Sequence, residues 1–318
     1  MTIPTPLRIV FMGTPAFAVG IAESILQSQH ELCGIVTVPD KPAGRGQKMH
    51  TSAVKEFALA HGLPLLQPDK LKDEHFVEAL RAWKADVFVV VAFRMLPAVV
   101  WQIPPKGTFN LHASLLPDYR GAAPIQWAII KGETQTGVST FFIDDKIDTG
   151  AVILQRSCTI GPDMTASELH DALMVLGQAA VLDTLEAIQW DTAAPRTQSA
   201  PRPHTEAPKL HRDNCKINWE QSGAQVYNQI RGLSLYPGAW CIWKTTTQDV
   251  EVKILEARFV PKVQSRPISV ELHIAAKTLK IPLEGGDVYI QQLQWPGKRK
   301  MNVQDFVNGY LLVPLVWP

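Results

Sequence analysis

Long apolar runs are missing from this 318-residue sequence, and no stretch of about 18 apolar residues suggests a membrane span. The first six residues, Met1-Thr2-Ile3-Pro4-Thr5-Pro6, lack the basic-then-apolar profile of a secretion signal. They also lack the Arg-rich amphipathic profile of an organelle presequence. We therefore expect a cytoplasmic protein.

Cysteine is scarce, and its four copies lie far apart in the sequence. None belongs to a Cys-x-x-Cys pair, and no cluster of Cys and His has the spacing of a zinc site. We expect reduced, mostly buried thiols and no bound metal. The four residues are Cys33, Cys158, Cys215 and Cys241.

Complete nucleotide-binding motifs are also absent. Gly44-Arg45-Gly46 lacks the spacing of a phosphate-binding P-loop and the Lys-Ser/Thr that would follow it. Gly13 follows the first apolar segment without the further glycines of a dinucleotide fingerprint. We therefore expect no nucleotide cofactor.

The composition is that of a folded protein, and the length suggests two domains. Apolar residues make up 46% of the sequence and charged residues 19%. The net charge of +1 is unevenly distributed: residues 191–318 carry 16 Lys and Arg against 11 Asp and Glu, and residues 1–190 carry 15 against 19. The basic second half is a modest indication of a polyanionic partner.

The first half alternates strand-like and helix-like segments, which predicts an α/β fold with a doubly wound, mostly parallel sheet. Segment 86–92 is almost wholly apolar and β-branched, as in a strand covered on both faces. Thr165 and Glu168 have the spacing of a capping box. Strands are predicted at 7–12, 31–38, 63–67, 86–92, 107–112, 136–143 and 151–160, and helices at 16–27, 51–61, 74–83 and 165–189.

The second half begins with a Pro-rich segment, 191–208, which we interpret as an extended linker. A helix is predicted at 222–233. Strands predicted at 238–244, 250–260, 270–281 and 288–295 indicate a small β-barrel. The predicted organisation is a catalytic domain at 1–190, the linker at 191–208 and a barrel domain at 209–318.

Candidate catalytic residues lie at the end of the predicted strand 107–112. Residues two apart on a strand point to the same face, so Asn110 and His112 project side by side. A carboxamide donor beside a titratable ring suits acyl chemistry, in which negative charge grows on a carbonyl oxygen. Asp148 is the best candidate to hold the ring, and the nearby Asp144 and Asp145 are its rivals.

The run Asn110-Leu111-His112-Ala113-Ser114-Leu115-Leu116-Pro117-Asp118-Tyr119-Arg120-Gly121, with its spacing to Asp148, resembles the active-site signature of 10-formyltetrahydrofolate-dependent formyltransferases. The segments 11–15, 39–46 and 121–125 resemble the members of this family that act on methionyl-tRNA, and weaker similarity continues through Trp219 and 236–238. The resemblance implies an OB-like C-terminal barrel. It also implies transfer of a formyl group from 10-formyltetrahydrofolate to methionyl-initiator tRNA in a bacterial cytoplasm. We expect a monomer.

In that reaction, Asn110 would donate to the tetrahedral oxyanion. His112 would donate to it as well, or relay a proton from the incoming amine to the folate nitrogen. Asp148 would hold His112 and stabilise its cationic form.

The resemblance also implies a folate site built from the backbone of Ser114, Leu115, Leu116 and Pro117. The pterin would extend to Phe93, Arg94 and Leu96 and to the loop 143–148. Segment 92–97 departs from the Ala-Tyr-Gly form of many relatives, which leaves the side-chain roles of Phe93 and Arg94 open. Leu96 and Leu116 could equally be core residues.

For the tRNA, the resemblance implies that the basic loop 39–48 wedges into the acceptor end through Lys41, Arg45 and Lys48. A solvated loop without that role is the alternative. Other basic residues could form a track for the phosphates. They are Lys209, Lys298 and Arg299, together with Arg196, Arg202, Arg212 and Lys300.

Three other functions use the same features. An enzyme that formylates an amino-sugar nucleotide or another small amine would share Asn110, His112 and Asp148. A hydrolase that releases formate from the folate would need no second substrate domain. A catalytically silent tRNA-binding protein would not need the three polar residues.

Overall fold

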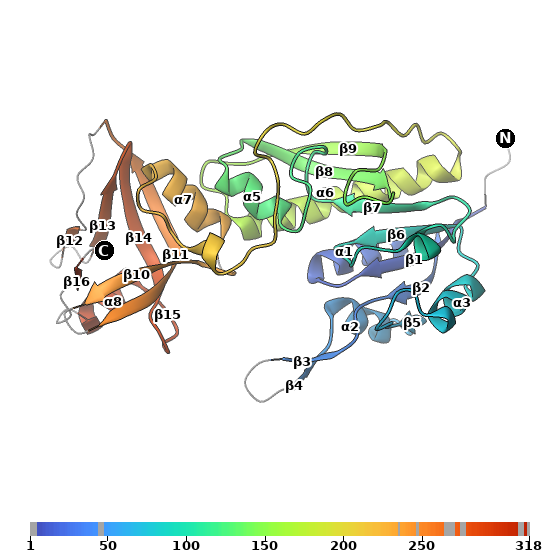
Figure 1. Ribbon diagram of the computed structural model, residues 1–318, viewed down its shortest axis with the longest axis horizontal. Helices are drawn as coiled ribbons and strands as arrows, with labels where there is room; N and C mark the ends of the chain where they lie inside the picture. Colours follow the sequence, from blue (N-terminus) through green and yellow to red (C-terminus); the bar gives the residue numbers. More distant parts are fainter. Residues whose placement is uncertain are drawn as a thin grey trace. The chain divides into compact units, whose positions relative to one another are not determined.

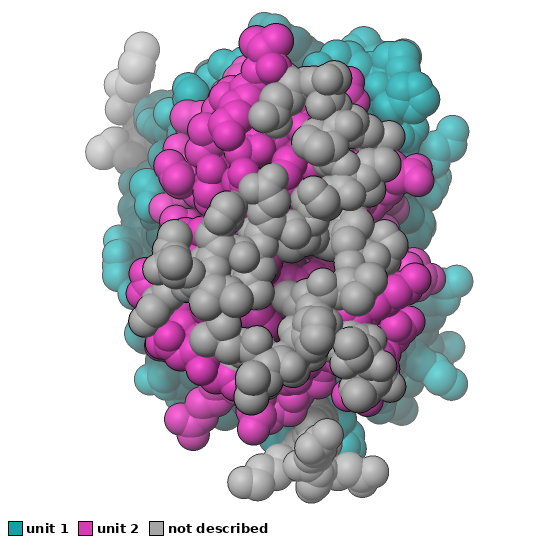
Figure 2. Space-filling view, turned by 90° about the vertical axis from the view of Figure 1, so that its left-hand side faces the viewer, with its two compact units in different colours: residues 1–121, 135–159, 170–206 teal, residues 122–134, 160–169, 207–318 magenta. Residues whose placement is uncertain are grey.

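The computed structural model describes residues 5–43, 48–234, 236–245, 248–263, 271–273, 278–310 and 315–316 (Figure 1). The chain divides into two compact units, which Figure 2 colours separately. The first comprises residues 1–121, 135–159 and 170–206, and the second comprises residues 122–134, 160–169 and 207–318. The units are therefore discontinuous in sequence, whereas the predicted domains are contiguous. The predicted linker belongs to the first unit as far as Glu206.

Seven described strands form the sheet of the first unit, in the order β5-β2-β1-β6-β7-β8-β9 (Figure 1). The strands from β5 to β7 are parallel, and β8 and β9 are antiparallel to their neighbours. Every residue of β6 is buried, as its Val/Phe sequence predicts. The mostly parallel α/β fold is confirmed. The bounds are β1 Arg8–Gly13, β2 Glu31–Val36, β5 Leu65–Leu66, β6 Val87–Val91, β7 Thr108–His112, β8 Gln135–Phe142 and β9 Val152–Thr159.

Helices cover both faces of this sheet. On one face α6 runs so close to β7 that a Cβ at Gly177 would lie 2.8 Å from Leu111. On the other face α3 packs into a core cluster with Phe88 and Val90 of β6. The predicted capping box of α6 is confirmed, because Thr165 and Glu168 exchange hydrogen bonds. The helix bounds are α1 Ala16–Leu26, α2 Ala53–Ala60, α3 Glu74–Ala82, α4 Ala98–Trp101 and α6 Ala166–Gln189.

The second unit combines an antiparallel sheet with α5 Pro124–Ile130, α7 Gly223–Gly232 and α8 Val303–Tyr310. Its buried core cluster includes Trp243 and Phe306. A full capping box between Ser222 and Gln225 begins α7 at the predicted place. The small antiparallel β domain is confirmed. Its strands are β10 Ala239–Thr245, β11 Asp249–Pro261, β12 Glu271–His273, β13 Thr278–Leu283, β14 Gly286–Gln294, β15 Lys300–Asn302 and β16 Leu315–Val316.

Several local elements differ from the sequence prediction. The single strand predicted at 270–281 is wrong, because β12 and β13 pair antiparallel with Leu272 opposite Leu279. Apolar residues stand at even positions up to Ile274 and at odd positions from Leu279, and the prediction overlooked this change of phase between the two strands. The sequence-based prediction also did not include the short helices α4, α5 and α8, or the antiparallel pair of β3 Lys41–Ala43 with β4 Lys48–His50.

The predicted state of the cysteines is confirmed. All four are free thiols; Cys33, Cys215 and Cys241 are buried, and Cys158 is half-buried. Burial raises the pKa of Cys33 to about 11. Within the described residues no group of His, Cys, Asp and Glu side chains is arranged to hold a metal ion. Likewise, no described helix combines the length and apolar character needed to cross a membrane.

Candidate active site

The candidate site is built on β7, which lies between β6 and β8 in the sheet. Phe109 and Leu111 are buried, and Leu111 faces α6. Because side chains alternate along a strand, Asn110 and His112 point to the opposite face. The structure therefore brings these two predicted residues together.

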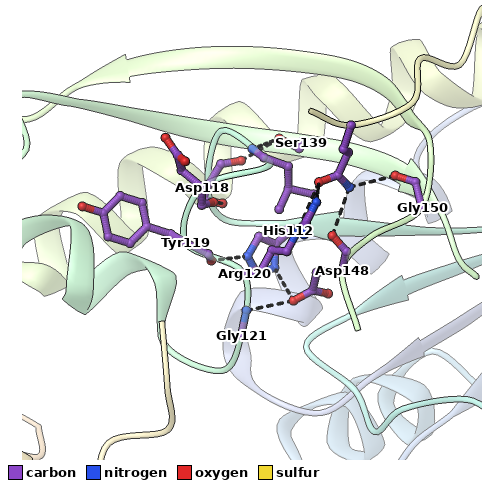
Figure 3. A network of polar contacts seen from close by, with 11 residues as sticks. His112, Asp118, Tyr119, Arg120, Gly121, Ser139, Asp148 and Gly150 are labelled. Atoms are coloured by element: carbon purple, nitrogen blue, oxygen red, sulfur yellow. Dashed lines mark hydrogen bonds and ion pairs between the residues drawn. The ribbon is translucent and has the colours of Figure 1, made fainter. Parts of the chain in front are cut away.

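Both ring nitrogens of the buried His112 face groups of the protein (Figure 3). Nε2 lies 2.8 Å from the backbone oxygen of Tyr119. A carbonyl oxygen only accepts, so we assign the proton of the neutral ring to Nε2. Nδ1 lies 3.8 Å from Oδ2 of Asp148. Nδ1 is thus the ring atom that can take up a further proton, and the resulting cation would face a carboxylate.

Asp148 reaches His112 by a route that the strand pattern did not predict. In a fully parallel sheet, the loop before Asp148 would lie beyond the carboxyl ends of the strands, as His112 does. Because β8 is antiparallel, that loop leaves the sheet beside the start of β7, where Ile143 N–H donates to the Thr108 carbonyl. It then folds back, and Asp148 Oδ2 accepts from the N–H of Gly121 at 2.9 Å.

The two rival carboxylates have other surroundings. Asp144 accepts from Thr149 Oγ1 and from the N–H of Lys146, which makes it part of the internal structure of the loop. Asp145 is exposed. Of the three aspartates, Asp148 is the one that the structure pairs with His112.

The side-chain oxygen of Asn110 is buried and has no hydrogen-bond partner among the described residues. Leaving a buried acceptor without a partner costs roughly 1–3 kcal/mol. A donor from a bound molecule would remove that cost. The site therefore fits a ligand that brings an N–H or O–H group to the strand bearing His112.

Three residues without the freedom of glycine adopt left-handed backbone conformations around the site. They are Ala92 after β6, with φ of 47°, Tyr119 after β7, with φ of 58°, and Asp148 after β8, with φ of 55°. Such a conformation costs roughly 1–2 kcal/mol for an L-residue. Strain of this kind concentrates where surrounding contacts fix a functional geometry.

The predicted folate-binding segment 114–117 already uses much of its backbone within the protein. Ser139 Oγ donates to the Ser114 carbonyl and accepts from the N–H of Leu116. Gln155 Nε2 donates to the Leu116 carbonyl at 2.8 Å. Leu115 and Pro117 are half-buried. Recognition by this backbone stays a prediction, and it would depend on second lone pairs of the carbonyls.

The other predicted folate contacts follow β6, which neighbours β7. Leu96 is buried in the core cluster under α3, and Phe93 and Ile143 pack against that cluster. The Arg94 guanidinium is turned toward the backbone, where Nη2 donates to the Pro68 carbonyl at 2.7 Å. Leu116 is also buried. Both leucines are thus buried, as core residues would be, and their contact with folate stays a prediction.

The predicted tRNA contacts are basic side chains with varied positions. Lys41, Lys209, Lys298 and Arg299 are exposed. Lys48 belongs to β4, and its side chain is outside the described part of the structure. Arg45 lies outside the described residues altogether.

Sequence reasoning missed the partners of the site in the Pro-rich segment 191–208. Arg202 pairs with Asp118, and Thr205 Oγ1 also donates to this carboxylate. Burial of the Asp118 carboxyl acts to raise its pKa, but these hydrogen bonds outweigh burial and the pKa is lowered. Gln198 contacts the loop of Asp148. No periodicity marks these residues, because each one is a polar side chain in an irregular segment.

Comparison with known proteins assigns the chain to a family. The family model described as formyl transferase matches residues 7–185, and that of the formyl transferase C-terminal domain matches residues 209–311. The methionyl-tRNA formyltransferase of Flavobacterium johnsoniae is 52% identical over 303 residues, which cover 95% of this chain and 96% of the relative. The chain belongs to the methionyl-tRNA formyltransferase family.

Solved structures with lower sequence identity share the fold of this member of the methionyl-tRNA formyltransferase family. HypX from Aquifex aeolicus in complex with tetrahydrofolic acid has a TM-score of 0.64 and 20% identity, covering 96% of this chain and 48% of HypX. The N-formyltransferase from Helicobacter canadensis, in complex with folinic acid and dTDP-3-aminofucose, has a TM-score of 0.62 and 19% identity, with coverages of 90% and 99%. These two similarities establish the fold.

Proposed function

We propose that this chain transfers the formyl group of 10-formyltetrahydrofolate to the amino group of methionyl-initiator tRNA. The product, N-formylmethionyl-tRNA, would serve translation initiation, and the enzyme would act as a cytoplasmic monomer in bacteria. The observation that carries the proposal is the pairing of His112 with Asp148 on the face of β7 that also bears Asn110. The methionyl-tRNA formyltransferase of Flavobacterium johnsoniae matches the chain over nearly its whole length.

The residues of the site fit the charge changes of this transfer. The folate supplies an activated formyl group. A bond forms between the amine nitrogen and the formyl carbon, and the bond from that carbon to N10 breaks. The Asn110 amide would donate to the oxyanion while its buried oxygen accepts from the attacking amine. One such donor is worth about 3 kcal/mol of barrier.

Proton transfer accompanies the change of bonds. The amine loses one proton on becoming an amide, and the leaving N10 gains one. His112 Nδ1 would carry this proton, because Nε2 is held by the Tyr119 carbonyl. Asp148, 3.8 Å away, would stabilise the imidazolium during the transfer. No covalent bond to the enzyme is required.

We propose that the folate lies along segments 93–96, 114–117 and 143–148, which surround this face of β7. The tRNA would be held by the basic groups Lys41, Arg45, Lys48, Lys209, Lys298 and Arg299. Contacts to phosphates would supply affinity and orientation, and contacts at the aminoacylated end would supply selectivity.

The decisive experiment offers the pure protein 10-formyltetrahydrofolate with four acceptors. They are methionyl-initiator tRNA, methionyl-elongator tRNA, uncharged initiator tRNA and an amino-sugar nucleotide. We expect rapid formylation of methionyl-initiator tRNA alone. Preferential formylation of the sugar, formate release without tRNA, or tRNA binding without turnover would each replace the proposal with the corresponding alternative.

Binding of initiator tRNA is expected to weaken strongly between about 50 and 200 mM salt, because bound phosphates release counterions. A footprint of six or more phosphates would reduce the affinity by roughly a thousandfold over this range. Filter binding or fluorescence anisotropy measures it. Arg45→Ala and Lys209→Ala should each make the logarithmic salt slope shallower by about one. A flat salt response in the unaltered protein would contradict the assignment of these residues.

A further inference from the structure

Gln198 lies between the two regions matched by the family models, in the segment that the sequence predicts to be a linker. Its side chain bridges two loops of the first unit. Nε2 donates to the backbone oxygens of Asp148, at 3.0 Å, and Gly150, at 2.8 Å. Oε1 accepts from Nε and Nη2 of Arg120, at 3.2 and 2.6 Å. Both ends of the amide are therefore used.

The two bridged loops carry the groups that surround the His112 ring. The loop of Arg120 supplies the preceding Tyr119 carbonyl, which holds Nε2, and the following Gly121 N–H, which holds the Asp148 carboxylate. The loop of Asp148 supplies the carboxylate that faces Nδ1. A single side chain from segment 191–208 thus fixes both loops relative to each other.

This bridge acts where the backbone needs support. Tyr119 and Asp148 both adopt left-handed conformations, which external contacts must maintain. The same segment anchors the first loop again, because the Thr205 carbonyl accepts from the Tyr119 N–H at 2.6 Å and the Arg202 N–H donates to Asp118 at 2.7 Å. Gln198 also reaches the second loop through its side chain, and Arg196 pairs by its backbone with Val152 just after that loop.

We propose that Gln198 is a positioning residue for the His112–Asp148 pair, holding the Asp148 carboxylate and the Tyr119 carbonyl on opposite nitrogens of the ring. Its effect on turnover rests on the proposed formyl transfer. Its effect on the ring environment does not. Gln198 touches neither reactant and acts only through the two loops.

Two substitutions test this role. Gln198→Glu keeps the length of the side chain and an acceptor for Arg120, but it removes the donor to the Asp148 and Gly150 carbonyls. Gln198→Met removes both interactions at similar volume. Ser199→Ala, at the exposed neighbouring position, is the control. We expect kcat to fall about 10-fold to 100-fold in both Gln198 variants, with KM for folate and for tRNA within about twofold.

A second measurement uses the protein without substrates. The Nε2–H of His112 should give an NMR signal protected from solvent exchange, identified by its loss in His112→Ala. We expect its exchange to accelerate at least about tenfold in the Gln198 variants. This corresponds to a decrease of about 1.4 kcal/mol in the free energy needed to open the two loops. It should be unchanged in Ser199→Ala.

The outcomes separate the two proposals. Unchanged exchange together with unchanged kcat in folded Gln198 variants would overturn the positioning role. Higher KM values together with a lower melting temperature, without faster exchange, would make Gln198 a general structural residue. This result would also overturn the positioning role. Faster exchange in a protein that formylates none of the acceptors would sustain the positioning role while the proposed reaction fails.

Discussion

Replacing Asn110 or His112 with alanine is expected to lower kcat by at least about 100-fold while leaving the Kd for the folate within about twofold. Each side chain would act on charge that develops only in the transition state, so its loss affects the barrier more than binding. Single-turnover formyl transfer and a separate folate titration measure the two quantities. The loss should be larger for His112→Ala, because it removes the proposed proton carrier and leaves the half-buried Asp148 carboxylate facing no ring, with the Gly121 N–H still donating to it.

The double variant provides the control for this prediction. If Asn110 and His112 act on one transition state, the combined loss should be smaller than the product of the single losses. Thermal unfolding must show that each variant retains its fold, since His112 is buried and bonded to the Tyr119 carbonyl. A loss below fivefold in both folded single variants would remove these residues from the reaction.

Gly150→Ala is expected to be nearly as damaging, although residue 150 presents no functional side chain. A Cβ at this position would lie 1.7 Å from the Phe142 carbonyl oxygen and 2.9 Å from its carbon. Because the obstacle is backbone, the loop must move, which displaces Asp148 from His112. We expect a loss of kcat of about 100-fold and a destabilisation of roughly 1–3 kcal/mol.

Gly161→Ala is the matched control for Gly150→Ala. There the nearest atom to an added Cβ is the Cβ of Met164 at 3.8 Å, which is ordinary contact. Kinetics and thermal unfolding should both be close to those of the unaltered protein. Wild-type activity in Gly150→Ala would show that the position of the Asp148 loop does not determine turnover.

The sequence predicts much of this fold because its strong signals are local. The wholly apolar β6, the capping box at Thr165 and the alternation that places Asn110 beside His112 depend on residues close in the chain. The course of the Asp148 loop is different. It depends on β8 running antiparallel, which no pattern within β8 records. The tautomer of His112 likewise depends on the Tyr119 carbonyl, a backbone atom without a signature in side-chain chemistry.

The Pro-rich segment shows the same limit most clearly. Its prolines and lack of periodicity correctly indicate the absence of helix. They do not reveal that Gln198 and Thr205 form hydrogen bonds with loops about 50 to 90 residues earlier. Such pairings depend on the folded path of both partners, so a single sequence does not specify them.

The interleaving of the two units limits how the chain can be divided into fragments. Ile130 packs against the C-terminal core, the Asp163 carboxylate accepts from Tyr227, and the Met164 carbonyl accepts from Arg231. A fragment that starts at residue 207 would lack Ile130, Asp163 and Met164. A fragment that ends at residue 206 would contain these three residues but not the C-terminal core that they contact. No single break in the polypeptide separates the two units, so we expect neither half to fold fully when it is expressed alone.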